Sequence, residues 1–278
     1  MALTGSAFET AHPARVYDHF LGGKTNYAID RAAGDQVLAV WPGARQAARA
    51  NRAFMHRAVR ILAQAGVHQF LDIGTGIPTE PNLHQIAQQT APKARVVYVD
   101  KDPLVLAHAD AWMRSTPEGR TGYVEADITT DVDRILTEAA DFLDFGQPVA
   151  VSLIALLHFV PDDHDAHGIV ARLLAPLPPG SALVISHGTE DFDPEVMRRV
   201  AAVYRNSGIA TQARSWTELS RFFTGLTLVT PPGIEAPHRW CPDPTDTPQR
   251  APDLDAQIAM WAGVGVKRPQ LRGRPRRG

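Results

Sequence analysis

Apolar and polar residues follow one another along the chain in two different patterns. Residues 1–12 are small and polar, and we expect them to be disordered. Between residues 13 and 65, apolar side chains recur every three or four positions, which is typical of amphipathic helices. A glycine pair and a Trp-Pro-Gly run interrupt this pattern. We therefore expect helices over 13–21, 30–40 and 44–65.

From residue 69 onward, short apolar runs alternate with amphipathic segments. Apolar runs bounded by turn residues predict buried strands. The predicted strands are 69–73, 95–99, 121–125, 148–154, 182–186 and 226–230, with a last one near 236–241. The predicted helices between them are 80–89, 103–114, 131–140, 165–176, 193–204 and 216–223. This alternation predicts an α/β fold in which helices cover both faces of a mainly parallel sheet.

The chain changes character beyond about residue 243. It becomes proline-rich and polar, with one short helical piece predicted near 252–262. The last twelve residues carry six arginine or lysine side chains and no acidic one. We therefore expect three parts: an N-terminal helical segment over 1–66, an α/β domain over 67–243, and a C-terminal extension over 244–278 that ends in a disordered basic tail.

The bulk composition is that of an ordinary globular protein. Of the 278 residues, 44% are hydrophobic and 21% charged, and the formal net charge of -2 favours neither nucleic acid nor a membrane as a partner. The single cysteine, Cys241, excludes an internal disulfide. The sequence has no secretory signal and no apolar stretch long enough to cross a bilayer. We therefore expect a cytoplasmic protein without a membrane partner.

The first predicted strand runs into a glycine turn, Asp72-x-Gly74-x-Gly76. Glycine allows positive φ and lets a ligand approach the bare backbone. The turn is not a dinucleotide fingerprint, because position 79 is Thr79, and it is not a P-loop, because no Gly-Lys-Ser/Thr follows. The acid at the start of the turn would repel a pyrophosphate but can accept a hydrogen bond from an ammonium group or a ribose hydroxyl. The turn therefore indicates a ligand with an amino acid end; the alternative is a plain strand-to-helix turn.

Acidic residues also follow the second and third predicted strands. Asp100 ends the second strand, where Rossmann-like sheets bind ribose hydroxyls. Asp102, directly before Pro103, is interpreted mainly as the N-cap of the next helix. Asp127 follows the third strand and, with a backbone amide, is suited to an adenine edge, with Ile128 packing on the ring; the alternative is a loop acid or a helix cap. Acids at three consecutive strand ends favour one shared ligand site.

These strand ends resemble the cofactor motifs of class I S-adenosylmethionine-dependent methyltransferases. Four segments, 13–27, 70–79, 97–100 and 157–162, are similar to an actinobacterial S-adenosyl methyltransferase family that was formerly a domain of unknown function. The resemblance spans about residues 13–241. It implies a Rossmann-like, seven-stranded sheet with helices on both faces and an antiparallel last strand.

The resemblance also implies a cofactor and a set of residues that bind it. The cofactor is S-adenosylmethionine, which is released as S-adenosylhomocysteine. The expected cofactor-binding residues are Asp72, Gly74, Thr75, Gly76, Asp100, Lys101, Asp127, Ile128 and Leu156.

The fourth predicted strand ends where a methyl acceptor would lie. It lacks the Asn/Asp-Pro-Pro-Tyr/Phe run that enzymes methylating nucleic-acid amino groups carry there. His158 is a candidate general base for an acceptor hydroxyl or amine, since imidazole titrates near neutrality. The alternative is a histidine that orients the loop by hydrogen bonding. With His164 and His167 it matches no zinc spacing, so we expect no metal.

Polar residues surround a glycine pair in the first helical segment. A helical segment before the first strand of this fold can lie across the cofactor site as a lid. Under this hypothesis Tyr17 and Asn26 face the methionine end of the cofactor or the acceptor, and Arg15 and Tyr27 belong to the same lid. The alternative is that these residues are solvated helix ends.

Taken together, the sequence predicts a methyltransferase that uses S-adenosylmethionine and acts on a small-molecule acceptor. Methyl transfer requires the acceptor to be held in line with the methyl group, so no protein nucleophile is needed. A different hypothesis is a cofactor-binding regulator or pseudoenzyme on the same fold. A third is a nucleic-acid methyltransferase tethered by the arginine-rich tail, against which the acidic body argues. The sequence identifies neither the acceptor nor an oligomeric state.

Overall fold

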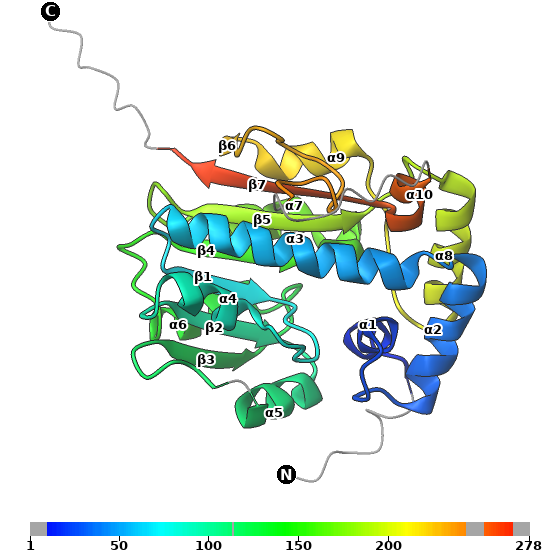
Figure 1. The fold of residues 1–278 in the computed structure, drawn as a ribbon, viewed down its shortest axis with the longest axis horizontal. Helices are drawn as coiled ribbons and strands as arrows, with labels where there is room; N and C mark the ends of the chain where they lie inside the picture. Colours follow the sequence, from blue (N-terminus) through cyan, green and yellow to red (C-terminus); the bar gives the residue numbers. More distant parts are fainter. Residues whose placement is uncertain (1–9, 113, 243–252, 269–278) are drawn as a thin grey trace, which may run out of the picture.

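The core of the protein is a single seven-stranded sheet (Figure 1). The computed structural model describes residues 10–112, 114–242 and 253–268. The strands lie in the order β3-β2-β1-β4-β5-β7-β6, and β7 runs antiparallel to both of its neighbours while the other pairs are parallel. The strands are β1 (Gln69–Ile73), β2 (Arg95–Asp100), β3 (Arg120–Glu125), β4 (Ala150–Ile154), β5 (Ala182–Gly188), β6 (Leu226–Leu228) and β7 (Met260–Lys267).

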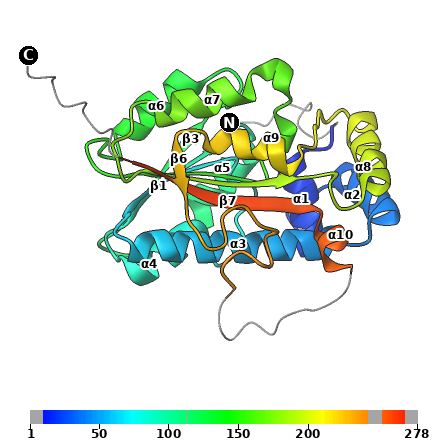
Figure 2. The same ribbon diagram turned by 90° about the horizontal axis from the view of Figure 1, so that it is seen from above.

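Helices cover both faces of the sheet (Figure 2). Alternate strand residues pack on opposite layers, as the pleat requires: Leu71 and Ile73 belong to the core under α6 and α7, whereas Phe70 packs under α3 and α4. The helices of one face are α3 (Ala44–Gln64) and α4 (Leu83–Thr90), and those of the other include α6 (Val132–Ala140), α7 (Ala166–Leu174) and α9 (Trp216–Ser220).

A third group of helices lies beyond the carboxyl ends of the parallel strands (Figure 1). It consists of α1 (Pro13–Leu21), α2 (Ala28–Val40) and α8 (Pro194–Asn206). Val16, Val37 and Met197 belong to one apolar cluster that joins these helices to each other. The remaining elements are α5 (Pro103–Trp112), α10 (Leu254–Ile258) and the short 3-10 helices η2 (Leu157–Phe159), η3 (Asp162–His164) and η4 (Arg221–Phe223).

The predicted strand near 236–241 is wrong. That segment forms a turn in which the Ala236 carbonyl accepts hydrogen bonds from the backbone N–H groups of Arg239 and Trp240. Trp240 is fully buried, packs edge-on against Phe54 at 5.1 Å, and donates its indole N–H to the Gly233 carbonyl. Trp240 is therefore apolar because it packs in the core from a turn, and not because it belongs to a strand.

The last strand lies instead in the segment predicted as a C-terminal extension. The predicted helical piece ends early, because Ala259 adopts φ 45° after α10, and β7 begins at the next residue. Gly265 leaves room for Phe223, since a Cβ on this glycine would lie 2.8 Å from that ring. The sheet therefore includes residues beyond the predicted boundary at 243, while most of the basic tail, 269–278, lies outside the described residues. Among the helices of the described ranges, none has both the length and the apolar character needed to cross a bilayer.

Candidate active site

A cavity of about 250 Å³ lies at the carboxyl ends of the parallel strands. Its walls come from the strand ends, from α1, α3 and α8, and from the start of β7. All nine residues expected to bind the cofactor line this cavity, as do His158 and Tyr17. The structure therefore brings these residues together, and their contacts with a ligand stay predictions.

The glycine turn after β1 has the backbone conformation that its sequence predicts. Gly74 and Gly76 have φ values of 73° and 67°, in the left-handed region that favours glycine. The Gly74 N–H donates to the Val99 carbonyl at 2.8 Å, which fixes the turn on β2. The Leu156 side chain lies so close over Gly74 that a Cβ there would stand 2.6 Å from it. Only a glycine fits beneath this leucine without a rearrangement.

Asp100 joins the turns that follow β1 and β2. One carboxylate oxygen accepts from the Gly76 N–H at 2.9 Å, and the other accepts from the Asp102 N–H at 3.0 Å. Burial raises the pKa of Asp100, and the two N–H donors oppose this shift. Asp102 accepts from the Leu104 N–H at 2.9 Å, so it caps α5 as predicted.

Asp127 is held by its own loop. Its carboxylate accepts from the backbone N–H and the hydroxyl of Thr129, at 2.9 and 2.8 Å, and from Lys101 Nζ at 3.1 Å. Burial opposes ionisation, but these donors and the Lys101 charge lower the pKa of Asp127 overall. Its own backbone N–H donates to Asp131, so an amide contact to a ligand has to come from another residue.

Asp72 lies at the point where the sheet order reverses, between β1 and β4. It is paired in register with Ser152 on β4 and is 9% exposed. Burial raises the pKa of Asp72 to about 6, and the nearby positive charge of Arg52 opposes that rise. Arg52 comes from α3 and lines the same cavity, where its guanidinium donates to the carbonyls of Thr79 and Pro81. Arg52 was not among the predicted site residues, because an arginine in an arginine-rich helix carries no local signal.

Asn51 supplies a buried polar atom without a partner. The side chain is fully buried and lines the cavity. Its Nδ2 donates to the Tyr17 hydroxyl at 3.0 Å, and that hydroxyl donates to the Ala48 carbonyl at 2.9 Å. Within the described part of the chain, no group donates to Asn51 Oδ1. Buried acceptors are nearly always paired, so this oxygen is suited to a donor on a ligand.

His158 lies on η2, directly after β4, beside a second buried histidine. The Gly188 N–H donates to His158 Nδ1 at 3.4 Å, and His187 Nδ1 contacts the Gly188 carbonyl at 2.7 Å. Arg214, 1% exposed, donates to His187 Nε2 at 2.8 Å and pairs with Asp162 at 2.6 Å. Burial, with the neighbouring His187 and the Arg214 charge, keeps the pKa of His158 well below its ordinary value. His158 is therefore neutral at physiological pH.

The whole described body of the chain matches one protein family. The profile of the S-adenosyl methyltransferase family matches residues 6–268. This chain belongs to the S-adenosyl methyltransferase family.

Two crystal structures resemble this methyltransferase over nearly its full length. A DUF574 family protein from Streptomyces avermitilis is 50% identical, with 94% of this chain and 98% of that chain covered and a TM-score of 0.89. A predicted methyltransferase from Thermobifida fusca is 35% identical, with 94% and 97% covered and a TM-score of 0.85. The plantazolicin methyltransferase BpumL, at 10% identity and a TM-score of 0.52, shares the fold alone. No curated protein matches. The predicted family, fold, methyltransferase activity and S-adenosylmethionine cofactor are confirmed.

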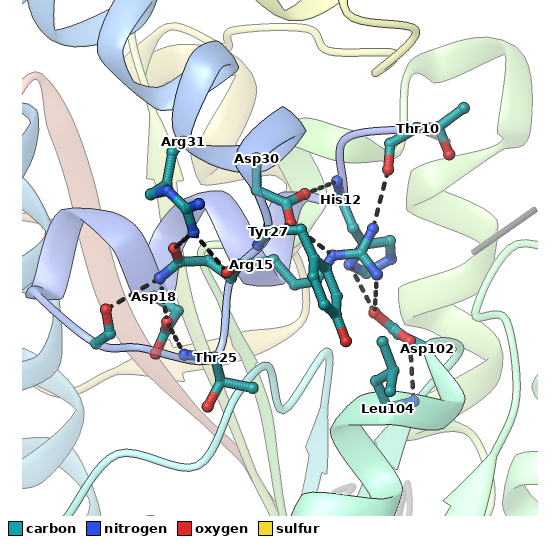
Figure 3. A network of polar contacts seen from close by, with 12 residues as sticks. Thr10, His12, Arg15, Asp18, Thr25, Tyr27, Asp30, Arg31, Asp102 and Leu104 are labelled. Carbon is teal, nitrogen blue, oxygen red and sulfur yellow. Dashed lines mark hydrogen bonds and ion pairs between the residues drawn. The ribbon is translucent and has the colours of Figure 1, made fainter. Parts of the chain in front are cut away.

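Three of the residues predicted for a lid hold the N-terminal helices of the methyltransferase in place (Figure 3). Arg15 Nε lies 3.0 Å from Asp30 Oδ2, and its Nη1 lies 3.4 Å from Asp102 Oδ2. The guanidinium carbon of Arg15 lies over the Tyr27 ring, 5.4 Å from the centroid of that ring. Asn26 donates to Asp18 at 2.7 Å and is absent from the cavity wall. Arg15 and Asn26 are buried, so they are not solvated helix ends, and neither lines the cavity. Their contact with a ligand stays a prediction.

His12 lines the cavity of the methyltransferase from a segment that was expected to be disordered. Its Nδ1 lies 3.5 Å from Asp102 Oδ2, and its backbone N–H donates to Asp30 at 2.9 Å. Burial lowers the pKa of His12, although Asp102 and Asp100 oppose the shift. The sequence held no signal for this contact, because it depends on the distant start of α5.

Proposed function

We propose that this methyltransferase binds S-adenosylmethionine along the ends of β1, β2 and β3 and methylates a small molecule held beside the end of β4. One observation carries the proposal: Asp72, Asp100 and Asp127, from three adjacent strands, line a single cavity. Open α/β sheets bind their ligands at this reversal of strand order.

The residues present fit the amino acid end of the ligand. Asn51 Oδ1 is a buried acceptor that has no donor among the described residues, and Asp72 is a carboxylate that lines the same cavity. Both are suited to an ammonium group, and Arg52 supplies a positive charge for the α-carboxylate. The exposed backbone at Gly74 and Gly76 lets the ligand approach closely.

The adenosine end has matching partners on the next two strands. Asp100 has free lone pairs beyond its two backbone donors, and these are suited to ribose hydroxyls. Asp127 and Ile128 provide a carboxylate and an apolar side chain for the adenine ring.

When bound, S-adenosylmethionine supplies an electrophilic methyl group. The protein's task is then to hold the acceptor in line with that group, which lowers the entropic part of the barrier. Among the described residues that line the cavity, none is a cysteine, serine or lysine placed as a nucleophile near the end of β4.

Calorimetry tests the proposal. S-adenosylhomocysteine is titrated into the wild-type protein, into Asp72→Ala, and into Asp163→Ala, whose side chain is 80% exposed and serves as the control. We expect the Asp72 change to weaken binding by about a hundredfold, since it removes a charge-assisted partner, and the control to leave it unchanged. Equal affinity of all three proteins contradicts the site. A screen with methyl-labelled donor then separates an enzyme, which labels an acceptor, from a regulator, which labels none.

A further inference from the structure

The cavity has two chemically different walls. In the described residues, every Asp, Lys and Arg that lines it comes from α3 or from the ends of β1, β2 and β3. The lining residues from the end of β4 to the start of β7 include no Asp, Glu, Lys or Arg. That side is formed mainly by aromatic, sulfur-containing and aliphatic side chains, among them Phe159, Met197, Val200, Tyr204 and Met260. Trp41, which follows α2, also lines the cavity and packs with the same apolar residues.

This apolar wall is built as one unit. Trp41, Phe159 and Tyr204 belong to the apolar cluster that joins α1, α2 and α8. The rings of Phe159 and Tyr204 meet edge to face, with centroids 5.6 Å apart. Aromatic faces and edges of this kind pack well against a further flat ring.

Trp41 and His158 are two side chains of this wall that carry a hydrogen-bond donor for which the described residues show no acceptor. Trp41 Nε1 is buried and has no partner in the part of the chain that the structure describes. His158 accepts at Nδ1 from Gly188, so in its neutral form the proton sits on Nε2. Arg214 fixes this arrangement from behind, because it donates to the carbonyls of Leu157 and Val160 on either side of His158. An imidazole held in this tautomer presents a donor to the cavity and not a base.

The backbone of the same wall is strained. Ala155, at the end of β4, has φ 52°, and Ala259, before β7, has φ 45°, both in the left-handed region that alanine avoids. Both alanines line the cavity. Such conformations gather at ligand sites, where neighbouring contacts hold them. Ala155 is held by the hydroxyl of Ser186, which accepts from its N–H at 2.9 Å.

We propose that this apolar wall is the methyl-acceptor subsite and that its acceptor is an uncharged aromatic molecule whose oxygen atoms accept hydrogen bonds from Trp41 and His158. The proposal rests on the proposed function, which places the cofactor on the opposite wall. A carboxylate or ammonium group would be desolvated here without an opposite charge, so the wall selects against charged acceptors.

Binding of naphthalene derivatives to the full chain saturated with S-adenosylhomocysteine tests this inference. Calorimetry compares naphthol, which is neutral at pH 7, with naphthoate and with naphthylmethylammonium. We expect naphthol to bind at least about tenfold more tightly than either charged compound, because only it can enter without losing charge solvation. A charged compound that binds as tightly as naphthol overturns the proposal.

Variants locate the binding to the apolar wall. Val200→Asp places a carboxylate in the wall, and Arg199→Asp, on the exposed side of the same helix, is the matched control. We expect the first to weaken naphthol binding about tenfold or more and the second to leave it unchanged. Trp41→Phe keeps the aromatic packing and removes the donor, so it should weaken naphthol but not naphthalene. Equal naphthol affinity in Val200→Asp and Arg199→Asp overturns the proposal.

The proposed function and the acceptor inference can be contradicted separately. Affinity for S-adenosylhomocysteine, measured in every variant, reports both on folding and on the cofactor wall. If the wild-type protein does not bind S-adenosylhomocysteine, the proposed function is wrong. The naphthol, naphthoate and naphthylmethylammonium titrations, repeated without S-adenosylhomocysteine, then still test whether the apolar wall prefers an uncharged aromatic molecule. If S-adenosylhomocysteine binds and naphthol does not, the acceptor inference alone is wrong.

Discussion

The carboxylate of Asp100 accepts the backbone N–H of Gly76 at 2.9 Å, across 24 positions of sequence. This contact connects the glycine turn after β1 directly to the acid at the end of β2, so two segments that are proposed to bind the cofactor are joined. The second carboxylate oxygen of Asp100 accepts from the Asp102 N–H, and Asp102 in turn contacts Arg15 of the N-terminal helices.

Asp100→Asn should damage both stability and cofactor binding. In asparagine, an NH2 group replaces one of the two carboxylate oxygens. This NH2 group would face a backbone N–H, so two hydrogen-bond donors would point at each other. We expect a loss of about 1–3 kcal/mol in the free energy of unfolding and an affinity for S-adenosylhomocysteine at least about tenfold lower. Urea denaturation and calorimetry measure the two effects, and Asp163→Asn provides the exposed control.

Gly74→Ala tests the packing of Leu156 on the glycine turn. The substitution adds strain at φ 73° and places a Cβ 2.6 Å from that leucine. Gly66→Ala is matched in backbone conformation, with φ 91°, but has open space around the new Cβ. We expect both to lose about 1–2 kcal/mol of stability through strain, and only Gly74→Ala to lose S-adenosylhomocysteine binding. Equal binding by the two variants would contradict the close approach at this turn.

Asn51→Leu should separate stability from ligand binding. Removing a buried acceptor that has no donor is nearly neutral for folding, although the contact to Tyr17 is lost as well. We expect a stability change within about 1 kcal/mol and an affinity for S-adenosylhomocysteine about tenfold lower. Tyr17→Phe should weaken binding by a smaller factor, since it only loosens Asn51. Undiminished affinity in Asn51→Leu would remove this residue from the site.

Asp72 predicts a specific dependence on pH. Its pKa is raised by burial to about 6, above the ordinary value of about 4. In the folded state Asp72 therefore holds a proton that the unfolded state releases, so the contribution of Asp72 to the free energy of unfolding falls as pH rises from 4 to 6. An ammonium ligand needs the ionised carboxylate, so affinity for S-adenosylhomocysteine should rise about tenfold between pH 5 and pH 7. The affinity trend should vanish in Asp72→Asn, and the stability trend should become weaker, since the raised pKa of Asp100 keeps its own contribution. A wild-type affinity that is flat over this range would contradict the assignment.

Arg15→Lys should loosen the N-terminal helices and leave the sheet intact. A lysine keeps the charge but cannot reach Asp30, Asp102 and the Thr10 carbonyl together. We expect a loss of about 3 kcal/mol in the free energy of unfolding, since buried carboxylates lose their partner. Hydrogen exchange should quicken in α1 and α2 but not in β1 to β5. Arg31→Lys, at an exposed position on α2, is the control.

The sequence indicated those site residues whose signal is local. Asp72, Asp100 and Asp127 each end an apolar run, and the positions of strand ends follow from the fold. Asn51, Arg52 and His12 could not be found in this way, because their role depends on where α3 and the N-terminal segment lie against distant strands.

The fold was predictable to the same extent. Four of the five parallel strands, β1, β2, β4 and β5, are near-continuous buried runs, which a local pattern reveals, whereas β3 alternates between buried and more exposed positions. β7 was not predicted as a strand, because it contains two glycines, Gly263 and Gly265, which leave room for Phe223. No residue near them in the sequence indicates this contact. The apolar side chain of Trp240 led to a strand prediction that is wrong, because Trp240 lies in a turn and packs on Phe54.

The position of β7 also determines the order in which the protein can be completed during synthesis. β7 lies between β5 and β6, and its first residues close one wall of the cavity. A nascent chain that has not yet released residue 267 from the ribosome therefore carries two unpaired strand edges and an open ligand site. Such edges are where chains associate wrongly. The wall of the cavity at β7 and the pairing of β5 and β6 with β7 are therefore completed in the same step, after the other strands have been synthesised.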